Sequence, residues 1–175
     1  MLRLMLLRHA KSDWGDAARH DIDRPLNDRG QAAARRMAAY IGDENLLPDL
    51  ILCSSAQRTR ETLAYLLPVL DGEYQIRIRP DLYHQNEDTY APIIRKDGGT
   101  ARRLLVIGHN PAIEETAMSL VGSGRGEDIE DMGTKYPTGA LAVLDFEAGA
   151  WADVADESGR LDRFIKPRSL EIPDE

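Results

Sequence analysis

LRLMLLRH, residues 2–9, is the stretch that decides the fold we expect for this chain. Its first six residues are apolar except for Arg3, which predicts a strand buried on both faces of a sheet. The apolar run then stops at a charged pair, Arg8 and His9. A buried strand that ends in polar side chains is typical of a strand that delivers those side chains to a site.

Two further apolar runs also end in polar residues. Asp49–Cys53 is followed by Ser54–Arg58, and Arg103–Gly108 is followed by His109 and Asn110. In a parallel α/β sheet, the carboxyl ends of the strands line the ligand crevice. We therefore expect two histidines and two arginines, far apart in the sequence, to converge at one edge of the sheet.

The segments around these runs predict alternating helices and strands. Helices are expected at Gly30–Ile41, Ala56–Leu67, Glu87–Lys96 and Ala112–Val121, and further strands at Gln75–Ile78 and Ala140–Phe146, with a terminal hairpin at Trp151–Val154 and Arg160–Ile165. Asn27 or Asp28 can cap the first helix, Pro68 stops the second, and Pro92 falls inside the third. Gly122–Glu127 is expected to be a flexible loop. This alternation predicts an α/β domain with a largely parallel central sheet flanked by helices.

Length and composition fit one soluble domain over residues 1–175, with 42% hydrophobic and 30% charged residues. The net charge of −8 disfavours nucleic acid or an anionic membrane as a partner, so a phosphate site would have to be a local basic island. Cys53 is the single cysteine, which excludes an intrachain disulfide and fits the cytoplasm. The apolar Met1–Leu7 is too short for a signal peptide, and no run approaches the roughly 20 apolar residues of a membrane span.

The two histidines and two arginines suit phosphoryl transfer. Arginine forks match phosphate oxygens in a bidentate manner. An imidazole can attack phosphorus and hold the phosphoryl group covalently. Fixed cations stabilise the charge on the transferred group, which supplies most of the catalysis.

Several motifs together resemble the histidine phosphatase superfamily, and more closely its SixA-like phosphohistidine phosphatase branch. They are LRHAKSDW at 7–14, RPLNDRG at 24–30, SSAQRTRET at 54–62, VIGHNP at 106–111 and PTG at 137–139. The resemblance runs from Leu4 to about Leu170. It implies a single histidine phosphatase domain with the three-layer, phosphoglycerate-mutase-like fold.

The resemblance also implies roles for individual residues. His9 would be the nucleophile that becomes phosphorylated. Arg8 and Arg58 would clamp the phosphoryl oxygens. His109 would face His9 across the phosphoryl group and donate a hydrogen bond to it.

The rim of the expected site has less specific candidates for substrate binding. Ser12 is a candidate donor to the phosphoryl group, and Asn110 a residue that shapes the pocket. Lys11 would either attract phosphate or be solvated. Arg24 would either touch the substrate or form an ion pair with an aspartate of the 21–23 segment.

This sequence departs from the superfamily at three places. Ala10 replaces the usual glycine after the nucleophile, and Gly15 stands where the phosphoglycerate mutase branch has asparagine. That branch also has a glutamate acid, whereas the segment 81–85 contains none and the next glutamate is Glu87. These differences weaken a mutase interpretation and leave His84 as the candidate for a general acid, if one is needed.

Three functions follow from these patterns. The first is a phosphatase that acts on protein phosphohistidine or on a small phosphorylated compound. The second is a mutase-like phosphomonoesterase for metabolites, and the third is a non-catalytic module that binds phosphorylated partners. The intact histidine pair and arginine pair favour an enzyme. We expect no cofactor and no metal, because the four histidines have no paired ligand spacing and there is one cysteine.

Overall fold

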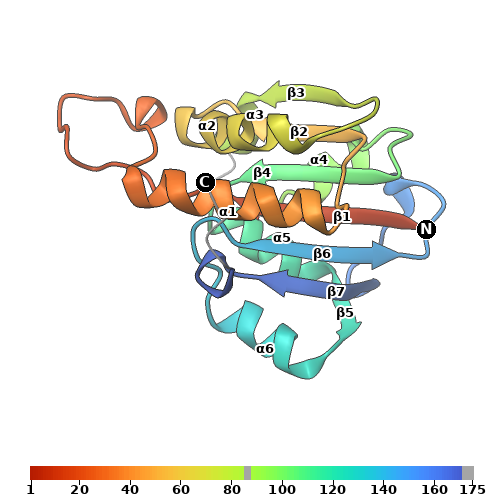
Figure 1. Cartoon of the computed structure of the whole chain (residues 1–175). Coiled ribbons are helices and arrows are strands. Elements are labelled where there is room, and N and C mark those ends of the chain that lie inside the picture. Colours follow the sequence, from red (N-terminus) through yellow and green to blue (C-terminus); the bar gives the residue numbers. More distant parts are fainter. Residues whose placement is uncertain (85–87, 171–175) are drawn as a thin grey trace.

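The computed structural model describes residues 1–84 and 88–170, which form one seven-stranded sheet in the order β3-β2-β4-β1-β6-β7-β5 (Figure 1). The strands are β1 (Leu2–Arg8), β2 (Leu50–Ser54), β3 (Gln75–Arg79), β4 (Arg103–Gly108), β5 (Val121–Gly124), β6 (Leu141–Phe146) and β7 (Gly159–Ile165). β1, β4, β2 and β3 are mutually parallel, and β6 is antiparallel to both β1 and β7. The largely parallel sheet that the alternation predicted is confirmed.

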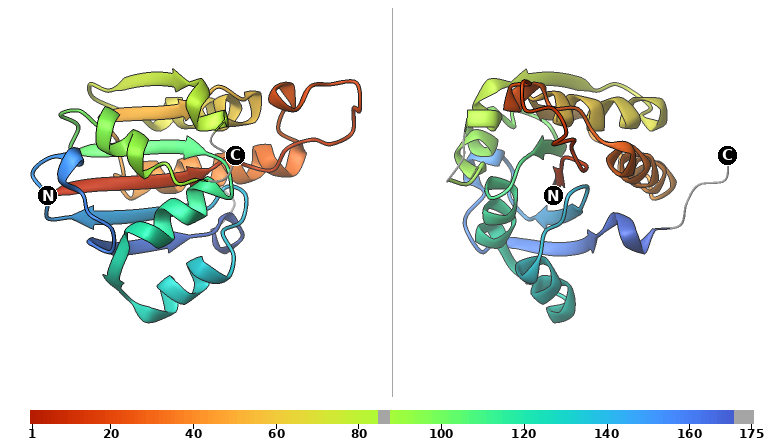
Figure 2. Two further views of the ribbon diagram at one scale, coloured as in Figure 1. Left: turned by 180° about the vertical axis from the view of Figure 1, so that it is seen from behind. Right: turned by 90° about the vertical axis from the view of Figure 1, so that its left-hand side faces the viewer.

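Helices cover both faces of the sheet. They are α1 (Asp28–Asp43), α2 (Gln57–Leu66), α3 (Pro80–His84), α4 (Ala91–Asp97), α5 (Ala112–Leu120) and α6 (Gly126–Thr134), with 3-10 turns at Asp21–Asp23, Leu67–Val69, Trp151–Asp153 and Pro167–Ser169. α1 and α2 lie on one face, and α4 and α5 lie on the other (Figures 1 and 2). This is the expected three-layer arrangement.

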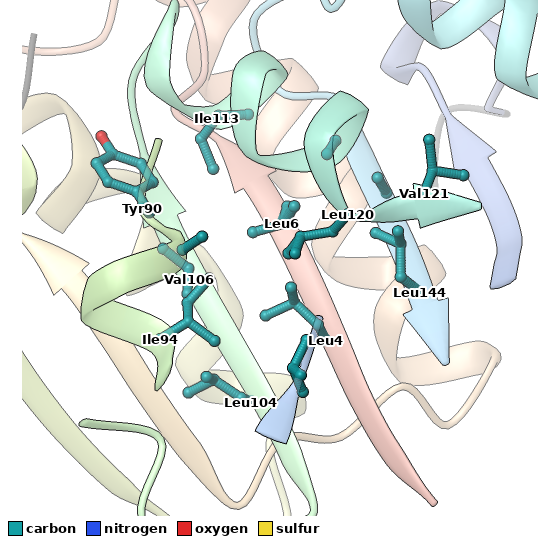
Figure 3. Close-up of a cluster of buried hydrophobic side chains, with 14 of the residues drawn as sticks. Leu4, Leu6, Tyr90, Ile94, Leu104, Val106, Ile113, Leu120, Val121 and Leu144 are labelled. Atoms are coloured by element: carbon teal, nitrogen blue, oxygen red, sulfur yellow. The ribbon is translucent and has the colours of Figure 1, made fainter. Parts of the chain in front are cut away.

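β1 lies in the middle of the sheet and supplies side chains to both layers. Leu4 and Leu6 belong to the cluster that packs with α4 and α5 (Figure 3), whereas Met5 and Leu7 belong to the cluster on the α1 and α2 side. All four are at most 1% exposed. Successive strand residues point to opposite faces, so an uninterrupted apolar run is what a strand covered on both faces requires.

The start of α1 fixes the loop that follows β1. Asn27 is the cap, because its side chain accepts a hydrogen bond of 2.8 Å from the backbone N–H of Gly30. A Cβ atom on Gly30 would lie 2.0 Å from the carbonyl oxygen of Lys11. Glycine at this position therefore lets the loop after β1 pass directly against the helix.

The expected helix over Glu87–Lys96 is wrong in its extent. α4 begins at Ala91, with Pro92 in the first turn, where the missing N–H costs no helical hydrogen bond. Glu87 lies outside the described residues. A separate short helix, α3, precedes this region and carries Tyr83 and His84.

Two expectations for the last third of the chain are also wrong. Gly122–Glu127 is not a loop, since β5 pairs in parallel with β7 and α6 begins at Gly126. Trp151–Val154 is not a strand but contains a 3-10 turn, and the indole of Trp151 donates a hydrogen bond of 2.6 Å to the Ala101 carbonyl. In place of the expected hairpin, β7 pairs with β6.

None of the helices within residues 1–84 and 88–170 is both long and apolar enough to cross a membrane.

Candidate active site

The ends of three neighbouring parallel strands meet at one cleft, of about 720 Å³. His9 follows β1, Arg58 lies in the first turn of α2 after β2, and His109 follows β4. All nine residues singled out from the sequence line this cleft: Arg8, His9, Lys11, Ser12, Arg24, Arg58, His84, His109 and Asn110. The sheet topology thus produces the predicted convergence, since β4 lies between β1 and β2.

His9 is 7% exposed, and its ring is fixed by one hydrogen bond. Nδ1 lies 2.7 Å from the carbonyl oxygen of Ala10. Because a carbonyl oxygen only accepts, Nδ1 must carry the proton and Nε2 has a free lone pair. Burial, reinforced by the nearby charges of Arg58 and Arg8, holds the pKa of His9 well below its usual value, so the ring stays neutral and nucleophilic near pH 7.

His109 faces His9, with 5.1 Å between the two ring centroids. Its Nε2 lies 2.7 Å from the hydroxyl oxygen of Ser54, which also accepts a 3.3 Å hydrogen bond from the Ala56 N–H. We assign the Ser54 hydroxyl proton to the bond with Nε2, which puts the proton of the neutral His109 ring on Nδ1. Burial and the charge of Arg58 lower the pKa of His109 to about 3, so the ring is neutral.

Buried donors without a partner are concentrated in this cleft. Within the described part of the chain, four buried side-chain nitrogens have no hydrogen-bond partner, and three of them are Arg8 Nε, Arg58 Nε and His109 Nδ1. An unpaired buried donor costs roughly 1–3 kcal/mol, so native proteins rarely keep several together. Three such donors around one cleft suit a ligand with several acceptor oxygens, such as a phosphoryl group.

The cleft is strongly basic although the chain is acidic. Five cationic side chains line it: Arg8, Lys11, Arg24, Arg58 and Lys135. Asp21 is the one acid among the described residues of the lining. The same described residues contain no group of three or more metal-ligating side chains, so we assign no metal ligand here. The site is the local basic island that the net charge of −8 required.

Arg24 forms the ion pair that was one of the two alternatives left by the sequence, and it also lines the cleft. Its Nε pairs with Asp21 Oδ1 at 3.0 Å, so the aspartate partner is Asp21 rather than Asp23. Its Nη1 donates to the Ser12 hydroxyl at 2.9 Å. The guanidinium also stacks on Trp14, with Cζ 3.4 Å from the ring centroid. Arg24 therefore lines the cleft and also ties the loop after β1 together.

Tyr136 is a positioning residue that the sequence did not reveal. Its carbonyl oxygen accepts hydrogen bonds from Arg8 Nη1 at 2.8 Å and from Asn110 Nδ2 at 3.1 Å. Its own hydroxyl donates to the Leu6 carbonyl, which anchors the segment on β1. The available signal was its position just before the Pro137–Gly139 motif.

Asp21 and Tyr83 also line the cleft without having been predicted as site residues. The Tyr83 hydroxyl donates a 2.7 Å hydrogen bond to Asp21 Oδ2. Arg58 reaches the same aspartate with both terminal nitrogens, 2.9 Å to the backbone oxygen and 3.2 Å to Oδ2. In the sequence, the 21–23 segment offered aspartates only as partners for Arg24, and Tyr83 was only a part of the segment 81–85.

Comparison with known proteins decides the family. Residues 4–89 match the model of the histidine phosphatase superfamily, branch 1. A solved structure from Agrobacterium tumefaciens, assigned as phosphohistidine phosphatase SixA, is 30% identical with a TM-score of 0.76, covering 95% of this chain and 98% of that one. This chain belongs to the histidine phosphatase superfamily.

Two further similarities agree with this histidine phosphatase assignment. A structure from Nakamurella multipartitia, also assigned as phosphohistidine phosphatase SixA, is 29% identical with a TM-score of 0.79 and covers 95% of this chain and 96% of that one. An uncharacterised protein of Mycobacterium tuberculosis is 35% identical over 93% of this chain and its own full length. The expected SixA-like branch and the phosphoglycerate-mutase-like fold are confirmed, and the protein is a histidine-type phosphatase.

Proposed function

We propose that this histidine phosphatase removes the phosphoryl group from phosphohistidine on proteins through a phosphorylated His9. It would act as a single catalytic domain over residues 1–175, in the cytoplasm and without a metal or cofactor. One observation carries the substrate class: among the described residues that line the cleft, Asp21 is the one carboxylic acid, and its pKa is lowered. The SixA relatives, assigned to phosphohistidine, support the same class.

The acid that lines the cleft is held in its ionised form. Burial alone would raise the pKa of Asp21, but the hydrogen bond from Tyr83 and the charges of Arg58 and Arg24 outweigh burial and lower it. An ionised carboxylate has no proton to give to a departing alkoxide. A side chain that does donate this proton raises the rate of cleavage of an ester with a poor leaving group by about 10²–10⁴-fold.

Phosphohistidine does not need that donor. His9 Nε2 attacks phosphorus, the P–N bond to the substrate ring breaks, and its electron pair passes to the departing nitrogen. A substrate ring that is protonated on its other nitrogen leaves as neutral imidazole, and the ordinary pKa of a histidine ring is near 6.5. During this step Arg8, Arg58 and His109 Nδ1–H donate to the phosphoryl oxygens.

The second step restores the enzyme. Water attacks the phosphorus of phospho-His9, the P–Nε2 bond breaks, and its electron pair returns to Nε2. The water proton passes to solvent and inorganic phosphate leaves. The hydrogen bond from His9 Nδ1 to the Ala10 carbonyl keeps the same ring nitrogen aimed at phosphorus in both steps.

The test compares kcat/KM for three substrates: a phosphohistidine peptide, an aryl phosphate and a phosphoserine peptide. We expect the order phosphohistidine, then aryl phosphate, then phosphoserine, because the alkyl ester alone needs a strong acid. Equal rates on phosphoserine and phosphohistidine would contradict the proposal. In that case His84→Ala would follow, and a loss confined to phosphoserine would identify His84 as the acid.

A further inference from the structure

Asp21 has capacity for one more hydrogen-bond donor. Its Oδ1 accepts from Arg24 Nε at 3.0 Å, and its Oδ2 accepts from Tyr83 at 2.7 Å and from Arg58 Nη2 at 3.2 Å. A carboxylate offers about four acceptor positions, so three donors leave one position open. The side chain is 50% exposed and lines the cleft, so a bound molecule can reach it.

Aromatic rings lead from the nucleophile to this carboxylate. The His109 ring lies 5.1 Å from the His9 ring, and the Tyr83 ring lies 5.6 Å from the His109 ring in an edge-on arrangement. Tyr83 then reaches Asp21 through its hydroxyl. A planar ring attached to a phosphoryl group at His9 would therefore lie beside the Tyr83 ring, with the Asp21 carboxylate as a hydrogen-bond acceptor beyond it.

We infer that Asp21 and Tyr83 form the leaving-group side of the site. The imidazolium ring of a phosphohistidine substrate packs beside Tyr83 and donates its free ring N–H to the Asp21 carboxylate. When the P–N bond breaks, the electron pair moves onto the departing nitrogen. Neutral imidazole leaves with its N–H, and Asp21 remains ionised. This inference rests on the proposed function and identifies the residues that select the nitrogen leaving group.

The charge distribution gives this contact its importance. Five cations line the cleft and would repel a protonated substrate ring, which is the reactive form. Asp21 is the one described lining residue of opposite sign, so it favours the protonated ring at the position where the ring must be charged. An aryl phosphate has no ring N–H to donate and gains nothing from this carboxylate.

Asp21→Asn tests the inference, because asparagine keeps the shape and removes the charge. We expect kcat/KM for the phosphohistidine peptide to fall about 10- to 100-fold, the range for a hydrogen bond to a charged group. The value for the aryl phosphate should fall by a clearly smaller factor, because weakening the pair with Arg58 affects both substrates, whereas the contact with a ring N–H is lost for phosphohistidine alone. Tyr83→Phe keeps the ring and should give a smaller loss that is again larger for phosphohistidine than for the aryl phosphate.

Asp23→Asn is the matched control. It makes the same charge change in the same 3-10 turn, but Asp23 is not among the residues that line the cleft. Equal losses on both substrates in Asp21→Asn would overturn the inference, since Asp21 would then act only by holding Arg58. A higher kcat/KM for both substrates would also overturn the inference, because it would show that Asp21 competes with the phosphoryl group for Arg58.

The wild-type enzyme separates this inference from the proposed function. If it hydrolyses aryl phosphate but not phosphohistidine, the proposed function and this inference both fail. If it prefers phosphohistidine and Asp21→Asn retains that preference in full, only the inference fails. Thermal unfolding of each variant shows whether the fold is intact.

Discussion

Arg3 and Arg8 lie at opposite ends of β1 and have very different surroundings. Arg3 forms a bidentate pair with Asp145, with Nε–Oδ1 at 2.8 Å and Nη2–Oδ2 at 2.9 Å. Asp145 also binds Arg160 at 3.1 Å, so the group joins the adjacent strands β1, β6 and β7. Arg8 donates one hydrogen bond, to the Tyr136 carbonyl, and its Nε is buried without a partner among the described residues.

The difference separates an arginine with matched donors from a cleft arginine with an unmatched donor in one strand. At the amino end, arginine donors are matched to carboxylate oxygens, and the contact stabilises the sheet. At the carboxyl end, buried donors stay unmatched and lower stability by roughly 1–3 kcal/mol each. In the proposed function, phosphoryl oxygens would satisfy those donors, and binding would offset the lost stability.

The largest effect is expected from His9→Ala, which removes the proposed nucleophile at the carboxyl end of β1. Turnover should fall to background, and the phosphorylated enzyme should disappear. The measurement stops turnover in a denaturant without acid and follows phosphate on the protein, which should be stable to base and labile to acid, as a P–N bond is. His20→Ala is the control. Label on Ser54, Ser55 or Cys53 would contradict the mechanism.

Arg8→Ala should lower kcat about 10²–10³-fold, the scale of one lost transition-state donor. Lysine should rescue it poorly, because a point charge cannot replace a planar fork. The free energy of unfolding should change little compared with this loss of activity, because the substitution also removes a buried donor that has no partner among the described residues. Steady-state kinetics and urea titration of the same samples check both expectations. A large loss of stability with normal kcat would contradict the prediction, because Arg8 would then stabilise the fold as Arg3 does.

Asp145→Asn should produce the opposite pattern at the amino end. Asp145 is buried and serves two arginines, so weakening these charged hydrogen bonds should lower the free energy of unfolding by about 1.5–3 kcal/mol. The kcat should be unchanged below the melting temperature, because the site lies at the other end of β1. Reduced kcat in fully folded protein would show that the two ends are coupled.

The last prediction concerns the pH dependence of stability. His109 has a pKa of about 3 in the folded protein, below the ordinary 6.5 of an unfolded chain. Between these values the unfolded chain binds more protons, so stability should fall as pH decreases below 6.5, by at most about 1.4 kcal/mol per pH unit for this residue. Urea titrations from pH 7 to 4 should show a flatter decline in His109→Gln than in wild type. The same change at the exposed His20 is the control, and equal slopes in wild type and His109→Gln would refute the assignment.

Local sequence determined the elements that position the candidate site. Residues 2–9, with an apolar run ending in Arg8 and His9, are sufficient to predict β1 and the polar end that it delivers. The same holds for β2 and β4, because a strand covered on both faces has to be apolar at every position. Asn27 as a helix cap is equally local, since the cap and its Gly30 partner are three residues apart.

Elements that depend on distant partners were predicted poorly. Gly122 belongs to β5, whose pairing partner β7 begins only at Gly159. Trp151 forms a turn because its indole and its packing engage residues such as Ala101, about fifty positions earlier. Neither partner contributes to a local pattern, so hydrophobic periodicity could not reveal these structures.

The tertiary structure alone decided which other side chains complete the cleft. Asp21 and Tyr83 are 62 residues apart and meet because the 3-10 turn Asp21–Asp23 contacts α2, while α3 directly follows β3. It also decided the state of His9, since burial keeps the ring neutral and the Ala10 carbonyl selects its protonated nitrogen. Sequence motifs specify residue types at strand ends. Loops from distant parts of the chain come together only when the chain folds. The burial and the hydrogen-bond partners that set the charge of each group arise at the same time.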